Sequence, residues 1–313
     1  MGNLKAHQEG ASGGQQLSAI VRAPGSCGEL VQGTLGGTNF LITCPVDLYT
    51  TVTVRLDGKR IAAGEKTLAA LNRTWSYLGV GNMQFSVFID SEIPVGKGMA
   101  SSSADISAAC QAAALAVGKT LTDDEIADLA LTIEPTDGIF YPGIVMFDHV
   151  SGQMRRPLGL PPTIKIAVFD LGGEIDTLQF NRRGDLTMLN KAKEPLVRQA
   201  VELVRQGLAL GDTALIGKGA TLSALANQHI LPKPCLPQII EIIKDYGAAG
   251  VTVAHSGTVI GVLFDESVYE WIETCVKAIL AVCPGLKYLR TVQMVGGGLT
   301  IEGEYDYVRY GEI

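Results

Sequence analysis

The sequence is poor in the residues that build metal centres and disulfide frameworks. It contains four scattered histidines and six cysteines, and no two cysteines form a C-x-x-C pair. Structural zinc sites rely on closely spaced cysteines and histidines, so a zinc centre is not expected. Several cysteines lie within apolar segments, which favours buried free thiols. The six are Cys27, Cys44, Cys110, Cys235, Cys275 and Cys283.

The chain also lacks an excess of positive charge and any long apolar run. It has 25 lysines and arginines against 32 acidic residues, for a net charge of -7. Nucleic-acid binders carry a basic surface, so a polynucleotide partner is not expected. No segment approaches the roughly 18 to 20 apolar residues of a membrane helix, and no signal-peptide pattern is present. We therefore expect a soluble cytoplasmic protein without membrane partners.

The composition is that of a well-packed globular protein. Hydrophobic residues make up 47% of the 313 residues, a length sufficient for two domains. Residues 1–18 are polar and rich in glycine and glutamine, which predicts a disordered tail. The proline-rich segment RRPLGLPP at residues 155–162 is the best candidate for a linker. It predicts an N-terminal domain at 19–158 and a C-terminal domain at 159–313.

Hydrophobic patterning predicts an α+β protein. β-Branched and aromatic runs predict three early strands, and Thr122 with Glu125 forms a capping box that opens a helix. Strands and helices then mix in the order expected when helices cover one face of an antiparallel sheet. The predicted strands are 40–44, 47–56, 83–90, 143–149, 163–171, 251–255, 258–265 and 289–295; the predicted helices are 102–117, 122–134, 187–210, 213–229, 235–246 and 267–280.

The stretch PVGKGMASSSAD at residues 94–105 lies between a predicted strand and a predicted helix. Gly96 and Gly98 would let the backbone approach a ligand closely, and a helix N-terminus offers unpaired N–H groups to an anion. A serine hydroxyl could either cap the helix or reach a metal bound to phosphates. An ordinary serine-capped turn explains the spacing equally well. No G-x-x-x-x-G-K-[ST] and no G-x-G-x-x-G after a strand occurs, which excludes Walker-type and Rossmann readings.

Three segments together resemble the GHMP kinases, the family of galactokinase, homoserine kinase and mevalonate kinase. Residues 94–104 resemble the central motif, with Met99 and Ala100 in place of the usual Leu and Gly. APGSCGELVQG at 23–33 resembles the first motif, and GVTVAHSGT at 250–258 lies where the third belongs. The forms SCGELVQG, EPTDG and AHSGT are most similar to the L-threonine kinase branch of the family, which acts in cobalamin biosynthesis and is often encoded with propanediol-utilisation functions.

The resemblance implies a fold and a reaction. The fold would be the two-domain GHMP kinase fold, with a left-handed βαβ unit in the N-terminal ATP-binding domain and a ferredoxin-like C-terminal domain. The active site would lie in the cleft between them. The cofactors would be ATP and Mg²⁺, the substrate L-threonine, and the product O-phospho-L-threonine for the aminopropanol linker of cobalamin.

The resemblance also implies roles for two acids at the end of a predicted helix. Phosphoryl transfer needs charge neutralisation by a metal and a positioned hydroxyl nucleophile. Asp137 would be the catalytic residue that aligns or deprotonates the substrate hydroxyl. Glu134 would bind the metal together with Ser102, or with Ser101, and Glu125 or Asp128 could take the place of Glu134. Without the resemblance, Asp137 would be interpreted as a turn residue and Glu134 as a solvent-exposed acid at the end of a helix.

The remaining site residues follow from the three motifs. The nucleotide would be held by Pro94, Val95, Gly96, Lys97, Gly98, Met99, Ala100, Ser101, Ser102 and Ser103, and the substrate by Cys27, Glu29, Ser256 and Gly257. Glu29 could pair with the substrate ammonium, whereas Cys27 is also explained as a packed thiol. The cation for the substrate carboxylate stays open among Arg22, Arg55 and Arg290. Homoserine kinase is the nearest alternative activity, and a nucleotide-binding relative without turnover is the alternative outside enzymes.

Overall fold

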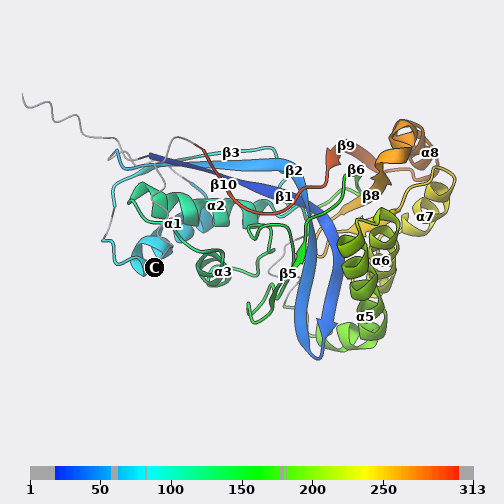
Figure 1. Cartoon of the computed structure of the whole chain (residues 1–313), viewed down its shortest axis with the longest axis horizontal. Coiled ribbons are helices and arrows are strands. Elements are labelled where there is room, and N and C mark those ends of the chain that lie inside the picture. The colour runs from blue at the N-terminus through cyan, green and yellow to red at the C-terminus, as the bar shows by residue number, and fades with distance from the viewer. Residues whose placement is uncertain (1–17, 58–62, 82, 176–179, 181, 303–313) are drawn as a thin grey trace, which may run out of the picture.

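The computed structural model describes residues 18–57, 63–81, 83–175, 180 and 182–302. The predicted tail lies outside these residues except for Ser18, which begins the first strand. That strand, β1 (Ser18–Leu35), forms an antiparallel hairpin with β2 (Thr38–Arg55). The hairpin extends from the half of the molecule that contains α1–α3 to the half that contains α5–α8 (Figure 1). It is the common centre of a ten-stranded sheet.

In the N-terminal half, strands extend the sheet from β2, and helices cover it. Both β3 (Ser86–Ser91) and β4 (Ile144–Phe147) pair with the same strand, β2, and β5 (Arg155–Gly159) pairs with β4. The helices are α1 (Glu65–Tyr77), α2 (Ser101–Ala116) and α3 (Asp123–Leu131). Helix α2 is apolar around almost its whole circumference and packs between the sheet and the other two helices, as a fully buried helix must.

The C-terminal half has the ferredoxin-like order. It begins with β6 (Ile164–Asp170), followed by α5 (Leu186–Leu210), α6 (Thr213–Ala226) and α7 (Leu236–Lys244). Strands β7 (Gly250–Val253) and β8 (Val259–Asp265), helix α8 (Ile272–Val282) and β9 (Lys287–Gln293) follow. The sheet order β7-β8-β6-β9, with all pairs antiparallel, is that of a βαββαβ unit. The ferredoxin-like prediction is confirmed.

The two halves share one sheet because β1 also borders the C-terminal half. Glu29 of β1 is paired with Val253 of β7, and the last described strand, β10 (Thr300–Glu302), returns to pair with residues 20–22 of β1. The buried side chains of β1, β2 and α2 join those of β6 and α5 in one large core, and a smaller core lies beneath α7 and α8. The motifs at 23–33 and 250–258 therefore meet inside the molecule.

The structure confirms most of the predicted elements and corrects several. The predicted strands at 40–44 and 47–56 are one strand, and β1, α1, β5 and β10 were not predicted. The segment expected to be an irregular linker contains β5, which accommodates Pro157 because it is an edge strand where a missing N–H is tolerated. The domain division near 155–162 stays a prediction. Within the described residues, each helix is too short or too polar to cross a bilayer.

Candidate active site

A cavity of about 620 Å³ lies where the motif segments converge. Its walls come from the glycine loop, the start of α1, the loop after α3 and the third motif. Its volume falls in the range of roughly 300 to 1,000 Å³ that small-molecule sites occupy. The lining residues are Leu41, Gly64–Thr67, Pro94–Gly96, Gly98–Ser103, Asp105, Glu134–Asp137, His149, Ile175, His255 and Ser256.

The glycine loop reaches α2 through three left-handed residues. Gly96, Gly98 and Ala100 have φ angles of 74°, 79° and 60°, and Ala100 directly precedes the first residue of α2. Among the described residues, Ala100 is the one non-glycine with positive φ, a conformation that costs an L-residue about 1 to 2 kcal/mol. This turn brings the N-terminus of a 16-residue helix to the cavity wall, where its unpaired N–H groups favour an anion.

The third motif holds the glycine loop in place. The carbonyl oxygen of Lys97 accepts hydrogen bonds from the N–H groups of Thr258, at 2.9 Å, and Val259, at 3.3 Å. A Cβ atom on Gly257 would lie only 2.2 Å from that carbonyl oxygen. The Lys233 ammonium donates to the Gly257 carbonyl oxygen at 2.5 Å. Gly257 is therefore a packing residue that permits close approach of the loop, and Ser256 beside it lines the cavity.

The serines at the start of α2 position the two acids. Ser102 Oγ donates a hydrogen bond to the Glu134 carboxylate. Ser103 Oγ accepts a hydrogen bond from the Asp137 backbone N–H at 3.0 Å. A hydroxyl and a carboxylate in contact offer the oxygen ligands that Mg²⁺ prefers, alongside the phosphate groups of a nucleotide. Within the described residues, no group of three or more His, Cys, Asp or Glu side chains is placed to hold a metal ion, so a metal here would rely on this small set and on the nucleotide.

A lysine that the sequence analysis did not single out lies beside this pair. Lys66, in the first turn of α1, places Nζ 2.6 Å from Glu134 Oε2 and 3.2 Å from Ser102 Oγ. Lys97, the lysine of the loop itself, points elsewhere. Its ammonium lies 3.0 Å from Asp170 Oδ2 and donates to the Gly173 carbonyl oxygen at 2.7 Å. The lysine in the cavity is therefore Lys66.

Asp137 has the electrostatic surroundings of a proton acceptor. Burial and the nearby charge of Glu134 raise its pKa to about 6, although the hydrogen bond with Ser103 opposes the shift. A base with a pKa near the working pH is well suited to remove a proton. Glu29 lies close by, and burial together with the charge of Asp137 raises the pKa of its carboxyl well above the usual value. Glu29 therefore holds its proton more readily than a free glutamate, and Asp137 carries the negative charge at this end of the site.

A second cavity of about 370 Å³ adjoins the first and has cationic walls. The two share Pro135, His149 and His255. The imidazole rings lie 4.9 Å apart, and burial lowers the pKa of His149 to about 4 despite Asp148, so this ring is neutral at pH 7. Burial likewise lowers the pKa of His255 well below its ordinary value. The charges come instead from arginines that precede α5, Arg182 and Arg183.

These arginines differ in their surroundings. Arg183 Nη2 lies 2.7 Å from Asp185 Oδ2, and its Nη1 donates to the Ile230 carbonyl oxygen at 2.7 Å. Arg182 lines the cavity and is exposed. Beneath the wall, buried Lys193 donates to Asn227 Oδ1 at 2.7 Å, and burial lowers the pKa of its ammonium to about 7. The second cavity thus suits a small anionic group.

Other predicted substrate residues lie behind the cavities. Cys27 is fully buried, and burial raises the pKa of its thiol to about 12, as in the packed-thiol alternative. Glu29 is 3% exposed, and its Oε2 has no hydrogen-bond partner within the described part of the chain. Neither side chain reaches the surface of either cavity. They support the floor of the site.

The alternative acids and cations are engaged away from the cavities. Glu125 completes the capping box with Thr122 and accepts from the Tyr77 hydroxyl at 2.5 Å. Asp128 forms an ion pair with Arg155. Glu134 is therefore the acid that accompanies Ser102. Among the three candidate arginines, Arg22 lies over Tyr49 and pairs with Glu302, Arg55 lies over Phe88, and Arg290 is in β9; none lines either cavity.

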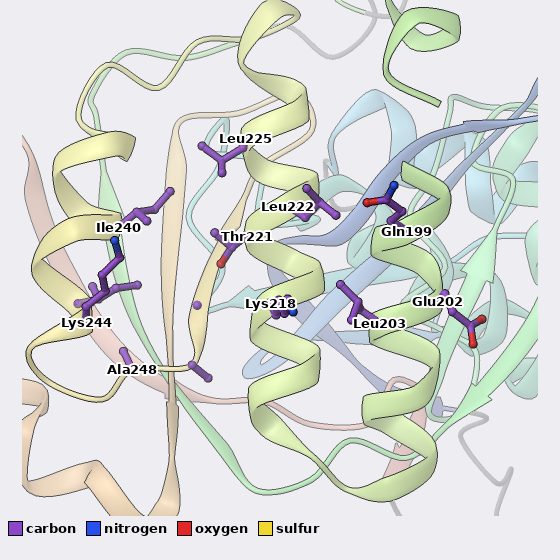
Figure 2. Close-up of a pocket in the computed structure, with 13 residues that line it drawn as sticks. Gln199, Glu202, Leu203, Lys218, Thr221, Leu222, Leu225, Ile240, Lys244 and Ala248 are labelled. Atoms are coloured by element: carbon purple, nitrogen blue, oxygen red, sulfur yellow. The ribbon is translucent and has the colours of Figure 1, made fainter. Parts of the chain in front are cut away.

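A larger cavity of about 800 Å³ lies on the outside of the C-terminal half. Figure 2 shows Leu203, Leu222, Leu225 and Ile240 from α5, α6 and α7 around it. Its lining is mainly apolar; it includes Gly250 from the edge of the third motif, but no other motif residue and none from the loop after α3. Size alone therefore does not identify the candidate site, whereas the convergence of the motif residues does.

Comparison with known proteins gives consistent matches. The family model described as GHMP kinases N terminal domain matches residues 65–141, and the one described as GHMP kinases C terminal matches residues 200–276. The L-threonine kinases of Salmonella typhimurium and Citrobacter freundii are 34% and 32% identical over 255 residues, which is 80% of this chain and 85% and 88% of theirs. A homoserine kinase structure from Cytophaga hutchinsonii matches with a TM-score of 0.67 and 18% identity, covering 96% of this chain and all of that one.

Proposed function

The chain belongs to the GHMP kinase family and is an ATP-dependent small-molecule kinase, and from this premise we propose that its substrate is L-threonine. The reaction transfers the γ-phosphoryl group of ATP to the threonine hydroxyl, and the products are ADP and O-phospho-L-threonine. The observation that carries the proposal is the junction of the two cavities. Asp137, in the loop after α3, lines the first cavity, and Pro135 of that loop lines both cavities.

The first cavity is the proposed nucleotide site. Residues 94–103 would surround the triphosphate, with the N-terminus of α2 directed at its negative charge. Ser102 and Glu134 would hold the magnesium ion, which supplies charge neutralisation on the phosphate groups when bound. The contact between the Ser102 hydroxyl and the Glu134 carboxylate supports this assignment. No positive surface elsewhere on this acidic chain is then needed to bind ATP.

Asp137 is the proposed catalytic residue. Its raised pKa allows the carboxylate to take the proton of the threonine hydroxyl while the oxygen attacks the γ-phosphorus. The hydrogen bond from its backbone N–H to Ser103 fixes the loop against α2. Because Ser102 and Ser103 are adjacent, the same helical turn sets the distance between the acid that binds metal and the acid that accepts the proton.

The second cavity is the proposed amino-acid site. A free amino acid carries a carboxylate and an ammonium, so its pocket needs charges of both signs. Arg182 provides the cation for the carboxylate, while the Asp137 carboxylate provides negative potential on the side where the ammonium lies. Glu29 lies buried behind it, and its raised pKa favours the neutral acid, so it supports this side as a hydrogen-bonding carboxyl. Ser256 lines the adjoining first cavity, next to His255, which borders both cavities, and would contribute a hydroxyl from that side. Cys27 and Gly257 act from behind by packing.

The wider role follows from the motif resemblance alone. O-Phospho-L-threonine would supply the aminopropanol linker of cobalamin, in the cytoplasm. A strain that lacks this chain is expected to accumulate cobalamin precursors, and added O-phospho-L-threonine is expected to relieve the accumulation. Normal cobalamin synthesis in that strain would contradict the role without affecting the proposed reaction.

Acceptor-dependent release of ADP tests the reaction. The purified protein is assayed with L-threonine, L-serine, L-homoserine and no acceptor, and the Asp137→Asn variant serves as the inactive control. We expect the largest kcat/KM with L-threonine. Preference for L-homoserine would identify a homoserine kinase instead. ADP release that no acceptor raises above background would identify a nucleotide-binding relative without turnover.

A further inference from the structure

The ion pair between Lys66 and Glu134 occupies the place proposed for the metal. Lys66 Nζ is within 2.6 Å of a Glu134 oxygen and within 3.2 Å of Ser102 Oγ, the two groups that would bind Mg²⁺. The Ser102 hydroxyl and the Glu134 carboxylate are themselves in contact. One ammonium thus contacts both side chains of the proposed metal site and neutralises the buried carboxylate.

The two partners of this pair differ in their exposure to solvent. The Glu134 side chain is 4% exposed and is held by Ser102, whereas the Lys66 side chain is 49% exposed. A buried carboxylate without a cation is costly, whereas a lysine on a flexible four-carbon stem can move into solvent or to another anion. Exchange of one cation for another at Glu134 is therefore possible without moving the carboxylate. The group that would move is the ammonium.

The other charged side chains around this cavity favour movement of the Lys66 ammonium toward the phosphate groups of a bound nucleotide. Asp105 lines the same cavity and accepts a hydrogen bond from Thr50 Oγ1 at 2.6 Å, so part of its accepting capacity is already used. Glu65, adjacent to Lys66, also lines the cavity. No other lysine or arginine lines this cavity in the part of the chain that the structure describes. A triphosphate in the cavity would be the strongest anion within reach of Lys66.

We infer that Lys66 is an internal counter-ion that exchanges with the divalent cation. In the nucleotide-free protein it neutralises Glu134. When a divalent cation binds to Ser102 and Glu134, like-charge repulsion displaces the ammonium, which then pairs with the phosphate groups of ATP. This inference rests on the proposed nucleotide and metal site but not on the identity of the acceptor. Lys66 would lower the affinity for free metal and raise the affinity for ATP.

Metal binding without nucleotide tests the first half of the inference, the competition between Lys66 and the divalent cation for Glu134. Mn²⁺ is titrated into the full-length protein and followed by electron paramagnetic resonance, in the wild type and in Lys66→Met. Removing a partly exposed competing cation is expected to tighten Mn²⁺ binding about two- to fivefold. Lys66→Arg keeps the charge and should bind Mn²⁺ within about twofold of the wild type. Lys244→Met is the matched control, because Lys244 pairs with Glu241 on α7 and lines neither cavity of the site.

Nucleotide binding at saturating Mn²⁺ tests the second half of the inference, because the metal has then displaced the ammonium. ATP is titrated under these conditions, and Lys66→Met is expected to bind it about tenfold more weakly than the wild type, whereas Lys66→Arg and Lys244→Met should bind it as the wild type does. The inference is overturned by unchanged or weaker Mn²⁺ binding in Lys66→Met, by the absence of detectable Mn²⁺ binding in both proteins, or by unchanged ATP affinity at saturating Mn²⁺. If Lys66→Met does not fold, Lys66→Gln takes its place. Neither measurement contains an acceptor substrate. A finding that L-threonine is not the substrate would therefore leave both results unchanged.

Discussion

One added methyl group at Gly257 should separate the phosphate loop from the third motif. The ideal Cβ of Gly257→Ala would lie 2.2 Å from the Lys97 carbonyl oxygen and 2.4 Å from Gly98 Cα. Both atoms belong to the backbone, so no side-chain rotation relieves the overlap. The Lys97 carbonyl must move by about an ångström to regain ordinary contact, and it then loses its hydrogen bonds from Thr258 and Val259.

The magnitude follows from overpacking and from the lost hydrogen bonds. Inserting a methyl group into a tightly packed site costs about 1 to 3 kcal/mol, and each lost hydrogen bond adds roughly 0.5 to 1.5 kcal/mol. Urea unfolding should therefore show a free energy of unfolding lower by about 2 to 6 kcal/mol. Because the displaced segment includes Gly98 and leads into Ala100, ATP affinity should fall about tenfold or more.

Gly81→Ala provides the control for this experiment. Gly81 has no atom within 4 Å of its ideal Cβ and does not have positive φ, so the same methyl group meets open space. Its stability and ATP affinity should match the wild type. If Gly257→Ala behaves like Gly81→Ala in both measurements, the close contact between the third motif and the loop does not hold the nucleotide site.

The remaining predictions concern chemistry, recognition and local stability. Asp137→Asn should lower kcat by about 10² to 10⁴ while the Kd for ATP, measured by calorimetry, changes little; near-normal turnover would remove Asp137 from its role. The pKa of Asp137 is raised to about 6, so its protonated, inactive fraction grows as the pH falls through 6. Below that pH, kcat/KM should therefore drop about tenfold per pH unit. A pH profile that stays flat down to about pH 4.5 would contradict this role. Arg182→Gln should raise the KM for threonine roughly tenfold to a hundredfold and leave that for ATP unchanged, since a charge-assisted hydrogen bond contributes about 1.5 to 3 kcal/mol; equal effects on both substrates would point to a general structural role. Thr122→Ala removes the capping box of α3 and should cost about 1 kcal/mol in thermal unfolding, with activity at 25 °C retained.

Local signals identified several segments that line the candidate site, because such signals depend on short stretches of chain. Gly96, Gly98 and the serines predict a turn that leads into a helix. Thr122 with Glu125 predicts the start of α3. The helix boundaries of α2 and α3 agree with the prediction to within a few residues. Such features follow from backbone geometry and capping, which a single segment determines.

Residues whose place in the site depends on packing between distant segments could not be found in the same way. Lys66 belongs to α1, which was not predicted although its buried residues Ala70, Leu71 and Trp75 follow a helical spacing. The contact of Lys66 with Glu134 depends on the packing of α1 against α2, which the sequence does not show. Arg182 reaches the second cavity only because α5 packs beside β1. The adjacent arginines ahead of α5 were the one available signal. Which serine contacts Glu134 is likewise set by side-chain packing, and the pattern of three serines does not encode it.

The hairpin of β1 and β2 sets a limit on how this molecule can be divided. Neither matched family segment, 65–141 or 200–276, contains residues 18–55, yet β1 contacts β2, β7, β10, α5 and α6. A fragment cut near residue 160 would leave the C-terminal half with β7 as an unpaired sheet edge and an uncovered face on α5 and α6. Both halves should therefore unfold together in a single transition, and exchange of one half between relatives would have to carry this hairpin with it.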